Sequence, residues 1–297
     1  MTVDKLETVA TTVDMNDREQ MTGVFAPREC LDHGFVRLVD YMGDDSAIVQ
    51  AARVSYGRGT KKRSDDRGLI RYLMRHSHTT PFEMVEFKFH VKLPIFVARQ
   101  WIRHRTANVN EYSARYSVME DEFYIPEGDQ ILYQSSSNKQ GRGGEQPPAE
   151  LREQFRELLE QTQKQSYAEY QDLIGKNLTR ELARIHLPVS VYTQWYWKID
   201  LHNLFHFLRL RVDDHAQYEI RVYAQAMAEI VKEIVPLAFE AFDDYTLNAV
   251  KLTKPELKLM RWIFDGFDCE ESDAEKAGLS KREYQELREK LAKIRSL

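Results

Sequence analysis

A short stretch at residues 103–116, RHRTANVNEYSARY, gathers many hydrogen-bonding side chains in one place. Its basic residues are all Arg or His, although lysine would serve a solvated helix end equally well, and Glu111 lies among them. Arginine forks donate two parallel hydrogen bonds to a phosphate or to the edge of a planar base. We therefore predict a binding site for a small anion or a planar heterocycle. Its candidate ligands are Arg99, Arg103, Arg105, Asn110, Ser113 and Arg115.

Motifs for several other kinds of chemistry are missing from the sequence. There is no G-x-S-x-G elbow and no P-loop, and GRGTKK lacks the third glycine of a dinucleotide-binding turn. Neither Cys30 nor Cys269 belongs to a CxxC or Cys/His ligand pattern, so a disulfide framework, zinc site or cysteine nucleophile is not expected. His202 and His206, four residues apart, could ligate one ion from a helix face. Because no carboxylate or cysteine completes such a set, we expect no metal.

The composition favours a folded protein that acts on small molecules. The chain has 297 residues, of which 42% are hydrophobic, and a net charge of −5. A non-specific nucleic-acid binder would need a strong basic excess, so we expect no nucleic-acid partner. The N-terminal sequence lacks the pattern of a secretory signal, and no apolar run approaches the roughly 20 residues of a membrane helix. We therefore predict a reduced, cytoplasmic protein without a membrane partner.

Elements with clear periodicity must position the stretch. Segment 85–93, VEFKFHVKL, alternates apolar and polar residues, which predicts a strand with one buried face. Pro94 suits the first position of a helix that ends within the stretch, which then continues as a loop. Further strands are predicted at 34–42 and 189–199, and Asp200 suits the N-cap of a following helix. Together these elements predict an α+β fold, an antiparallel or mixed sheet packed with long helices in a single domain.

The rest of the chain divides by composition. Segment 130–150 is poor in apolar residues and rich in Ser, Gly, Gln and Pro, which predicts a flexible surface insertion. Asp213 or Asp214 is predicted to cap a later helix that extends to Pro236. The predicted parts are an N-terminal extension (1–30), the main domain (31–248) and a charged helical C-terminal tail (249–297).

The stretch resembles the signature of the flavin-dependent thymidylate synthases, Arg-His-Arg followed by seven residues and a serine. Other segments resemble the family in the same order, namely RHSHTTPFE, LPIFVARQWIRHR, EFYIP, ARIHLP and LRVDDHAQYEI. The resemblance spans roughly residues 33–245 and implies methylation of dUMP to dTMP. It also implies FAD as the redox carrier, 5,10-methylenetetrahydrofolate as the carbon donor and NADPH as the reductant. The family assembles as a homotetramer whose active sites are shared between subunits.

The family pattern carries over to individual positions. It implies that Arg211 stabilises negative charge on the uracil ring, and that Ser113 is a phosphate ligand and not a nucleophile. The implied flavin-site residues are His78, Thr80, Glu83, Arg103, His104, Arg105, Asn110, Glu111, Asp200, Leu201, His202 and His206. The implied substrate-site residues are Gln100, Trp101, Ile102, Arg103, Glu111, Tyr112, Ser113, Ala114, Arg115, Arg184 and Arg211.

Some positions differ from common forms of the pattern, and two rival functions stand beside it. Asn108 replaces a frequent serine, and Asp200, His202 and His206 replace Asn, Arg and Asn. Asp200 could be a helix cap alone, and His206 a packed helix residue. One rival is a flavoprotein that methylates uracil in RNA, which would need a broad basic surface. The other is a nucleotide-binding regulator without turnover, which an NADPH oxidation assay would distinguish.

Overall fold

The computed structural model describes residues 22–54, 65–136, 141–253 and 278–295, together with positions 257, 272 and 275. The chain divides into two compact units, Met1–Leu247 and Asn248–Leu297. The second unit contains helix α11 (Lys281–Arg295). Among these described residues, no helix is both long enough and apolar enough to cross a membrane. Cys269 lies outside them, as do most of the predicted N-terminal extension and the GRGTKK segment.

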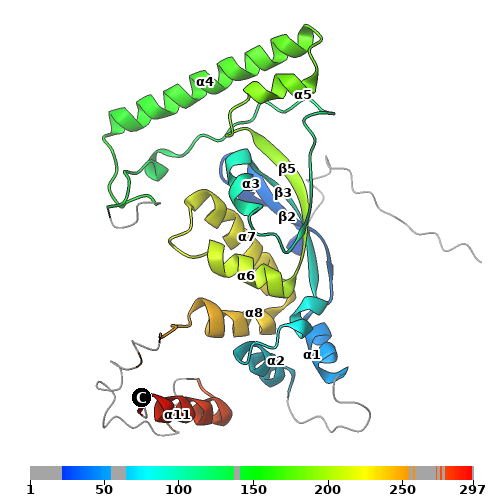
Figure 1. Cartoon of the computed structure of the whole chain (residues 1–297), viewed down its shortest axis with the longest axis vertical. Helices are drawn as coiled ribbons and strands as arrows, with labels where there is room; N and C mark the ends of the chain where they lie inside the picture. The colour runs from blue at the N-terminus through cyan, green and yellow to red at the C-terminus, as the bar shows by residue number, and fades with distance from the viewer. Residues whose placement is uncertain are drawn as a thin grey trace, which may run out of the picture. The chain divides into compact units, whose positions relative to one another are not determined.

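A five-stranded antiparallel sheet forms the centre of the first unit, with the strand order β1-β2-β3-β5-β4 (Figure 1). Its strands are β1 (Arg28–Cys30), β2 (Gly34–Met42), β3 (Glu86–Pro94), β4 (Asn108–Glu111) and β5 (Tyr192–Asp200). The sheet and its packed helices confirm the predicted α+β class. Strand β1 pairs with β2, although its residues fall within the predicted N-terminal extension.

The alternation in β3 places its apolar residues in the core, as predicted. Phe87, Phe89 and Val91 are fully buried. The expectation of a single buried face is wrong, however, because His90 and Lys92 on the opposite face are each only 3% exposed. Lys92 donates to Glu120 at 3.2 Å and also pairs with Glu122, so the segment after the signature stretch covers this face.

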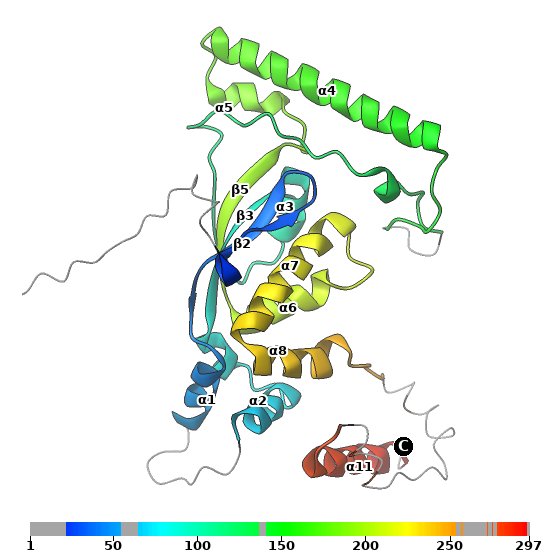
Figure 2. The same cartoon turned by 180° about the vertical axis from the view of Figure 1, so that it is seen from behind.

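The helices of the first unit form three groups, seen from opposite sides in Figures 1 and 2. Helices α3, α6 and α7 pack on strands of the sheet, and α7 also packs on α3 and α6. Helices α1, α2 and α8 lie near one end of the unit, and α4 and α5 lie near the other. Their bounds are α1 (Asp45–Val54), α2 (Asp66–Arg75), α3 (Ile95–Trp101), α4 (Ala149–Gly175), α5 (Arg180–Ala183), α6 (Leu201–Arg211), α7 (Tyr218–Ile234) and α8 (Pro236–Phe242).

Two helix starts test the predicted caps. Asp200 is the N-cap of α6 and accepts a hydrogen bond from the backbone N–H of Asn203 at 2.9 Å, as predicted. The prediction for the next helix is wrong, because α7 begins at Tyr218 and its N-cap is Gln217. Asp213 accepts instead from the backbone N–H of His215 at 2.8 Å. This local turn competes with helix initiation, as short polar side chains often do.

Candidate active site

The signature stretch folds into a turn and an edge strand. Helix α3 ends at Trp101, and residues 108–111 then form β4, which pairs with β5 alone. The predicted loop is therefore partly wrong. Pro94 ends β3 and is the N-cap of α3, so the predicted helix begins one residue later, at Ile95, and ends before the stretch. All four β4 residues are exposed, and Glu111 accepts a hydrogen bond from the Thr193 hydroxyl at 2.8 Å. The candidate binding residues thus lie along an open edge of the sheet.

A first pocket, which we call the Ser113 pocket, lies directly after β4 and has a volume of about 270 Å³. Ser113 and Arg184 are both half-buried in its wall, so a hydroxyl and a guanidinium face one cavity. Those two groups are suited to a phosphate. Arg115 forms an ion pair with Glu181 at 3.3 Å and does not line the pocket. The lining residues are Ile95, Glu111, Tyr112, Ser113, Ala114, Met119, Arg184, Leu187, Val191 and Thr193.

A second and larger cavity, the Arg211 pocket, has a volume of about 1310 Å³. Arg211 is the last residue of α6 and is half-buried, and its burial lowers the pKa of the guanidinium. Within the described part of the chain, no residue forms a hydrogen bond or ion pair with it. Gln100 also lines this pocket, and its buried Oε1 has no hydrogen-bond partner among those residues. A cation and an amide are therefore both available to a ligand.

The two pockets have no lining residue in common. The predicted substrate residues therefore fall into two groups within one chain. Glu111, Tyr112, Ser113, Ala114 and Arg184 line the Ser113 pocket, whereas Gln100 and Arg211 line the Arg211 pocket.

His104 lies at the meeting point of α3, β5 and α6. It is 9% exposed, and its ring centroid lies 5.4 Å from that of His206 and 5.6 Å from that of Phe207. The pKa of His104 is lowered to about 4, mainly by burial and in smaller part by the positive charges of the nearby His206 and Arg211. The imidazole is therefore neutral near pH 7, which suits packing against a planar ligand. Burial and the neighbouring Arg209 also lower the pKa of His206.

The remaining predicted flavin residues come from two segments that pack together. His78 and Thr80 are exposed and Glu83 is half-buried, all within or beside the turn Thr80–Met84. This turn contacts α6, the helix that carries Leu201, His202 and His206. The structure thus brings residues 78–83 next to α6, although more than 100 positions separate them in sequence. No group of three or more His, Cys, Asp or Glu side chains suited to a metal occurs among the described residues.

Several predicted site residues do not present their side chains to either pocket. Trp101 and Leu201 are fully buried in the core, so a ligand could reach at most their backbone. The exposed predicted residues that line neither pocket are His78, Thr80, Arg99, Ile102, Arg103, Arg105, Asn110, Arg115 and His206.

Sequence reasoning also missed residues that line the pockets. Thr193 belongs to β5 and is brought beside Glu111 by pairing between the two strands. Arg142 lies in the predicted insertion, whose composition resembled a surface loop. No sequence signal links Arg142 to its ion-pair partner Glu219, because 77 positions separate the two residues.

Comparison with known proteins places this chain in one family. A family model described as thymidylate synthase complementing protein matches residues 37–237. The chain belongs to the family of flavin-dependent thymidylate synthases. It is 60% identical over 267 residues to the flavin-dependent thymidylate synthase of Gluconobacter oxydans, covering 89% of this chain and 87% of that protein. It is 54% identical over 276 residues to that of Rickettsia conorii, covering 89% of this chain and 93% of that protein.

A solved structure is also similar to this chain. The UMP/dUMP methylase PolB from Streptomyces cacaoi, bound with 5-Br UMP, superimposes with a TM-score of 0.68 and 35% sequence identity. The match covers 74% of this chain and 98% of the methylase.

Proposed function

We propose that this protein catalyses the reductive methylation of dUMP to dTMP, with 5,10-methylenetetrahydrofolate as the carbon donor and NADPH as the reductant. The observation that carries this proposal is the Ser113 pocket, in which the end of the signature stretch meets Arg184. The relatives named above are flavin-dependent thymidylate synthases, and PolB is a UMP/dUMP methylase. A reaction on free nucleotides and folates is consistent with a cytoplasmic protein.

The residues around His104 fit FAD as the redox carrier. The buried imidazole is neutral, and the exposed His78 and Thr80 lie on the turn that packs against α6. Bound there, the flavin would carry reducing equivalents from NADPH to the nucleotide as it is methylated. Asp200, His202, His206 and the backbone of Leu201 would line the same site, with Arg103, Arg105 and Asn110 on the signature side.

Ser113 serves as a phosphate ligand in this proposal. Its hydroxyl accepts a long hydrogen bond from the backbone N–H of Arg115, at 3.4 Å. Among the described residues, no histidine or carboxylate is bonded to that hydroxyl, so it has no general base to activate it. Ser113→Ala should therefore raise the dUMP concentration needed for half-maximal rate and leave measurable turnover at saturation. A covalent adduct on Ser113, found by mass spectrometry, would contradict this role.

Arg211 lies at the uracil edge in the same proposal. A fixed and partly desolvated cation stabilises negative charge that develops on the ring more strongly than a hydrated one does. Since Ser113 and Arg211 line separate pockets of one chain, we infer that a nucleotide contacts Ser113 of one subunit and Arg211 of another. A homotetramer with shared sites would supply both.

The direct test begins with the absorbance spectrum of the purified protein loaded with FAD. NADPH should bleach the flavin bands, and dTMP should form only when dUMP, NADPH and methylenetetrahydrofolate are all present. A protein that takes up no FAD, or that makes no dTMP under these conditions, would contradict the proposal. A protein that binds dUMP without oxidising NADPH would instead be a nucleotide-binding regulator.

A further inference from the structure

The segment predicted as a flexible insertion contains a paired hairpin on both sides of residues 137–140. The backbone N–H of Gly143 donates to the carbonyl of Tyr133 at 2.7 Å, and that of Ser135 donates to Gly141 at 3.0 Å. Gln134 and Arg142 form an antiparallel bridge between the two sides. We call residues 133–136 with 141–143 the insertion hairpin. Its described backbone is fixed by its own hydrogen bonds.

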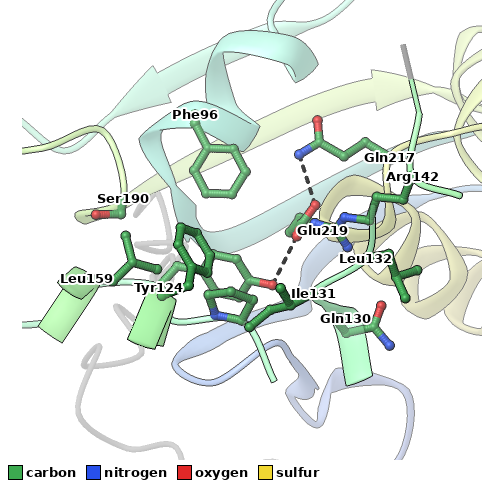
Figure 3. A pocket seen from close by; sticks show the side chains of 12 residues that line it. Phe96, Tyr124, Gln130, Ile131, Leu132, Arg142, Leu159, Ser190, Gln217 and Glu219 are labelled. Carbon is green, nitrogen blue, oxygen red and sulfur yellow. Dashed lines mark hydrogen bonds and ion pairs between the residues drawn. The ribbon is translucent and has the colours of Figure 1, made fainter. Parts of the chain in front are cut away.

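Arg142 attaches this hairpin to a buried carboxylate (Figure 3). It forms an ion pair with Glu219, which is only 1% exposed. Glu219 also accepts from the Tyr124 hydroxyl at 3.0 Å and from Nε2 of Gln217 at 2.9 Å. Three segments of the chain therefore converge on one carboxylate. Without Arg142, the hairpin would lose its ion pair to Glu219, and the buried carboxylate would be left without its cation. Removal of Arg142 should therefore release the hairpin.

The insertion hairpin lines one side of the Arg211 pocket. Tyr133 contributes an aromatic ring, and Gln134 and Ser135 contribute polar groups. The guanidinium groups of Arg209, Arg211 and Arg221 come from α6 and α7. An aromatic and polar wall suits a planar heterocycle, whereas arginines suit carboxylates or phosphates.

The Arg211 pocket is basic and has room for more than one ligand. Its volume of about 1310 Å³ exceeds the roughly 300–1,000 Å³ typical of a single small-molecule site. Its charged lining is basic in a chain whose net charge is −5. The arginines are Arg142, Arg209, Arg211 and Arg221, and the carboxylates are Asp213 and Asp214. Arg142 is paired with Glu219 and Arg221 with Asp214, so Arg209 and Arg211 are the arginines of this lining without a carboxylate partner among the described residues.

We propose that Arg142 is a positioning residue. Through Glu219 it holds the insertion hairpin in place, and the hairpin binds a second planar reactant with an anionic tail beside Arg211. This inference rests on the proposed function, in which Arg211 holds the uracil ring. The folate carbon donor and the nicotinamide reductant share the required chemistry.

The test measures KM separately for methylenetetrahydrofolate, NADPH and dUMP in the FAD-loaded protein. Arg142→Ala should raise KM for one of the first two by about tenfold, with kcat and the KM for dUMP each within about twofold of wild type. Arg142→Lys keeps a cation for Glu219 and should restore part of the loss. The substrate whose KM rises identifies the reactant that contacts the hairpin.

A matched arginine controls for general loosening of the insertion. Arg152 donates to the carbonyl of Gly128 at 3.0 Å and to the Gln146 side chain at 3.2 Å, but it does not line the Arg211 pocket. Arg152→Ala should leave all three KM values unchanged. If Arg142→Ala fails to fold, Tyr133→Ala removes a partly exposed ring from the same wall and should raise the same KM.

Calorimetric binding of tetrahydrofolate and NADP⁺ gives a second measurement that needs no turnover. One of these two probes should bind the wild-type protein more tightly than Arg142→Ala. Unchanged affinities and KM values, or a rise for dUMP alone, would overturn the inference. A wild-type protein that makes no dTMP would contradict the proposed function, and the calorimetric comparison would still decide the role of Arg142.

Discussion

Arg211 has two properties that seldom occur together in an arginine. It is half-buried, and no residue in the described chain neutralises it. Arg211→Ala should lower kcat/KM for dUMP by roughly 10²–10³-fold, the usual effect of removing one group that stabilises charge in a transition state. Arg211→Lys should restore little, because lysine lacks the planar fork.

Arg67 provides a comparison on the surface. Its ion pair with Glu240 joins two exposed or half-exposed side chains. Arg67→Ala should therefore cost at most about 1 kcal/mol of stability and should leave turnover unchanged. Steady-state kinetics and thermal melting of both variants give the comparison. Near-normal turnover in Arg211→Ala would show that its cation does not act on the substrate.

His104 should make stability depend on pH in a defined direction. Its pKa is about 4 in the folded protein against an ordinary value of 6.5, because burial disfavours the charged imidazolium. The unfolded chain therefore binds a proton in a range where the folded protein does not. The contribution of His104 to stability is complete above about pH 6.5 and is lost as pH falls towards 4.

Urea unfolding at pH 7.5 and pH 5 would measure this contribution. Between pH 7.5 and pH 5, the free energy of unfolding should fall less in His104→Gln than in the wild type. The test compares these two decreases and does not depend on how much the mutation destabilises the protein at either pH. An NMR titration of His104 with a midpoint near 6.5 would contradict the prediction.

At the scale of the element, Asp200 begins α6 and also stands where the family resemblance places a flavin contact. Its carboxylate accepts hydrogen bonds from the backbone and side-chain amides of Asn203, at 2.9 and 2.7 Å. Asp200→Ala should cost about 0.5–2 kcal/mol in denaturant unfolding, whereas Asp200→Asn keeps a good cap and should cost little. Equal losses in both variants would show that the charge matters more than the cap. Loss of FAD uptake by a stable Asp200→Asn protein would show a direct flavin contact.

Elements with their own periodicity could be predicted from sequence, and elements made by distant partners could not. The alternation of β3 reflects burial against the helices, and the Asp200 cap depends on residues three positions away. Strand β4 has no such signal, because all its residues are exposed and its pairing partner is β5. The burial of Lys92 depends in the same way on Glu120 and Glu122.

The candidate site divides along the same line. Ser113, Arg184 and Arg211 could be predicted from motifs that resemble those of the flavin-dependent thymidylate synthases. Thr193 and Arg142 were missed, because each reaches its pocket through a contact with a distant segment. The sequence around Thr193 indicates only an aromatic strand, and the sequence around Arg142 indicates only a polar loop.

At the scale of the whole molecule, the separation of the two pockets predicts complementation between subunits. Arg184→Ala removes a group from the Ser113 pocket, and Arg211→Ala removes one from the Arg211 pocket. Each variant alone should have little activity. After subunit exchange at equal amounts, about one quarter of the sites should combine two intact halves and recover activity.

Mass spectrometry under native conditions should verify that mixed oligomers have formed. The pair Ser113→Ala and Arg184→Ala, both in the Ser113 pocket, is the control and should gain nothing on mixing. A verified mixed oligomer without activity, or an active monomer in gel filtration, would contradict a site shared between chains.

The position of β4 at the sheet edge also sets an order of events during synthesis on the ribosome. Strands β2 and β3 can pair as soon as both have emerged, but β4 pairs with β5 alone, and β5 begins about 80 residues later in the chain. At roughly 5–20 residues per second, the signature strand waits about 4–16 s for its partner. During that interval its backbone donors and acceptors are unpaired, as on any exposed sheet edge. The segment that carries the site is thus among the last parts of the sheet to form, and the nascent chain is most open to mispairing just before β5 arrives.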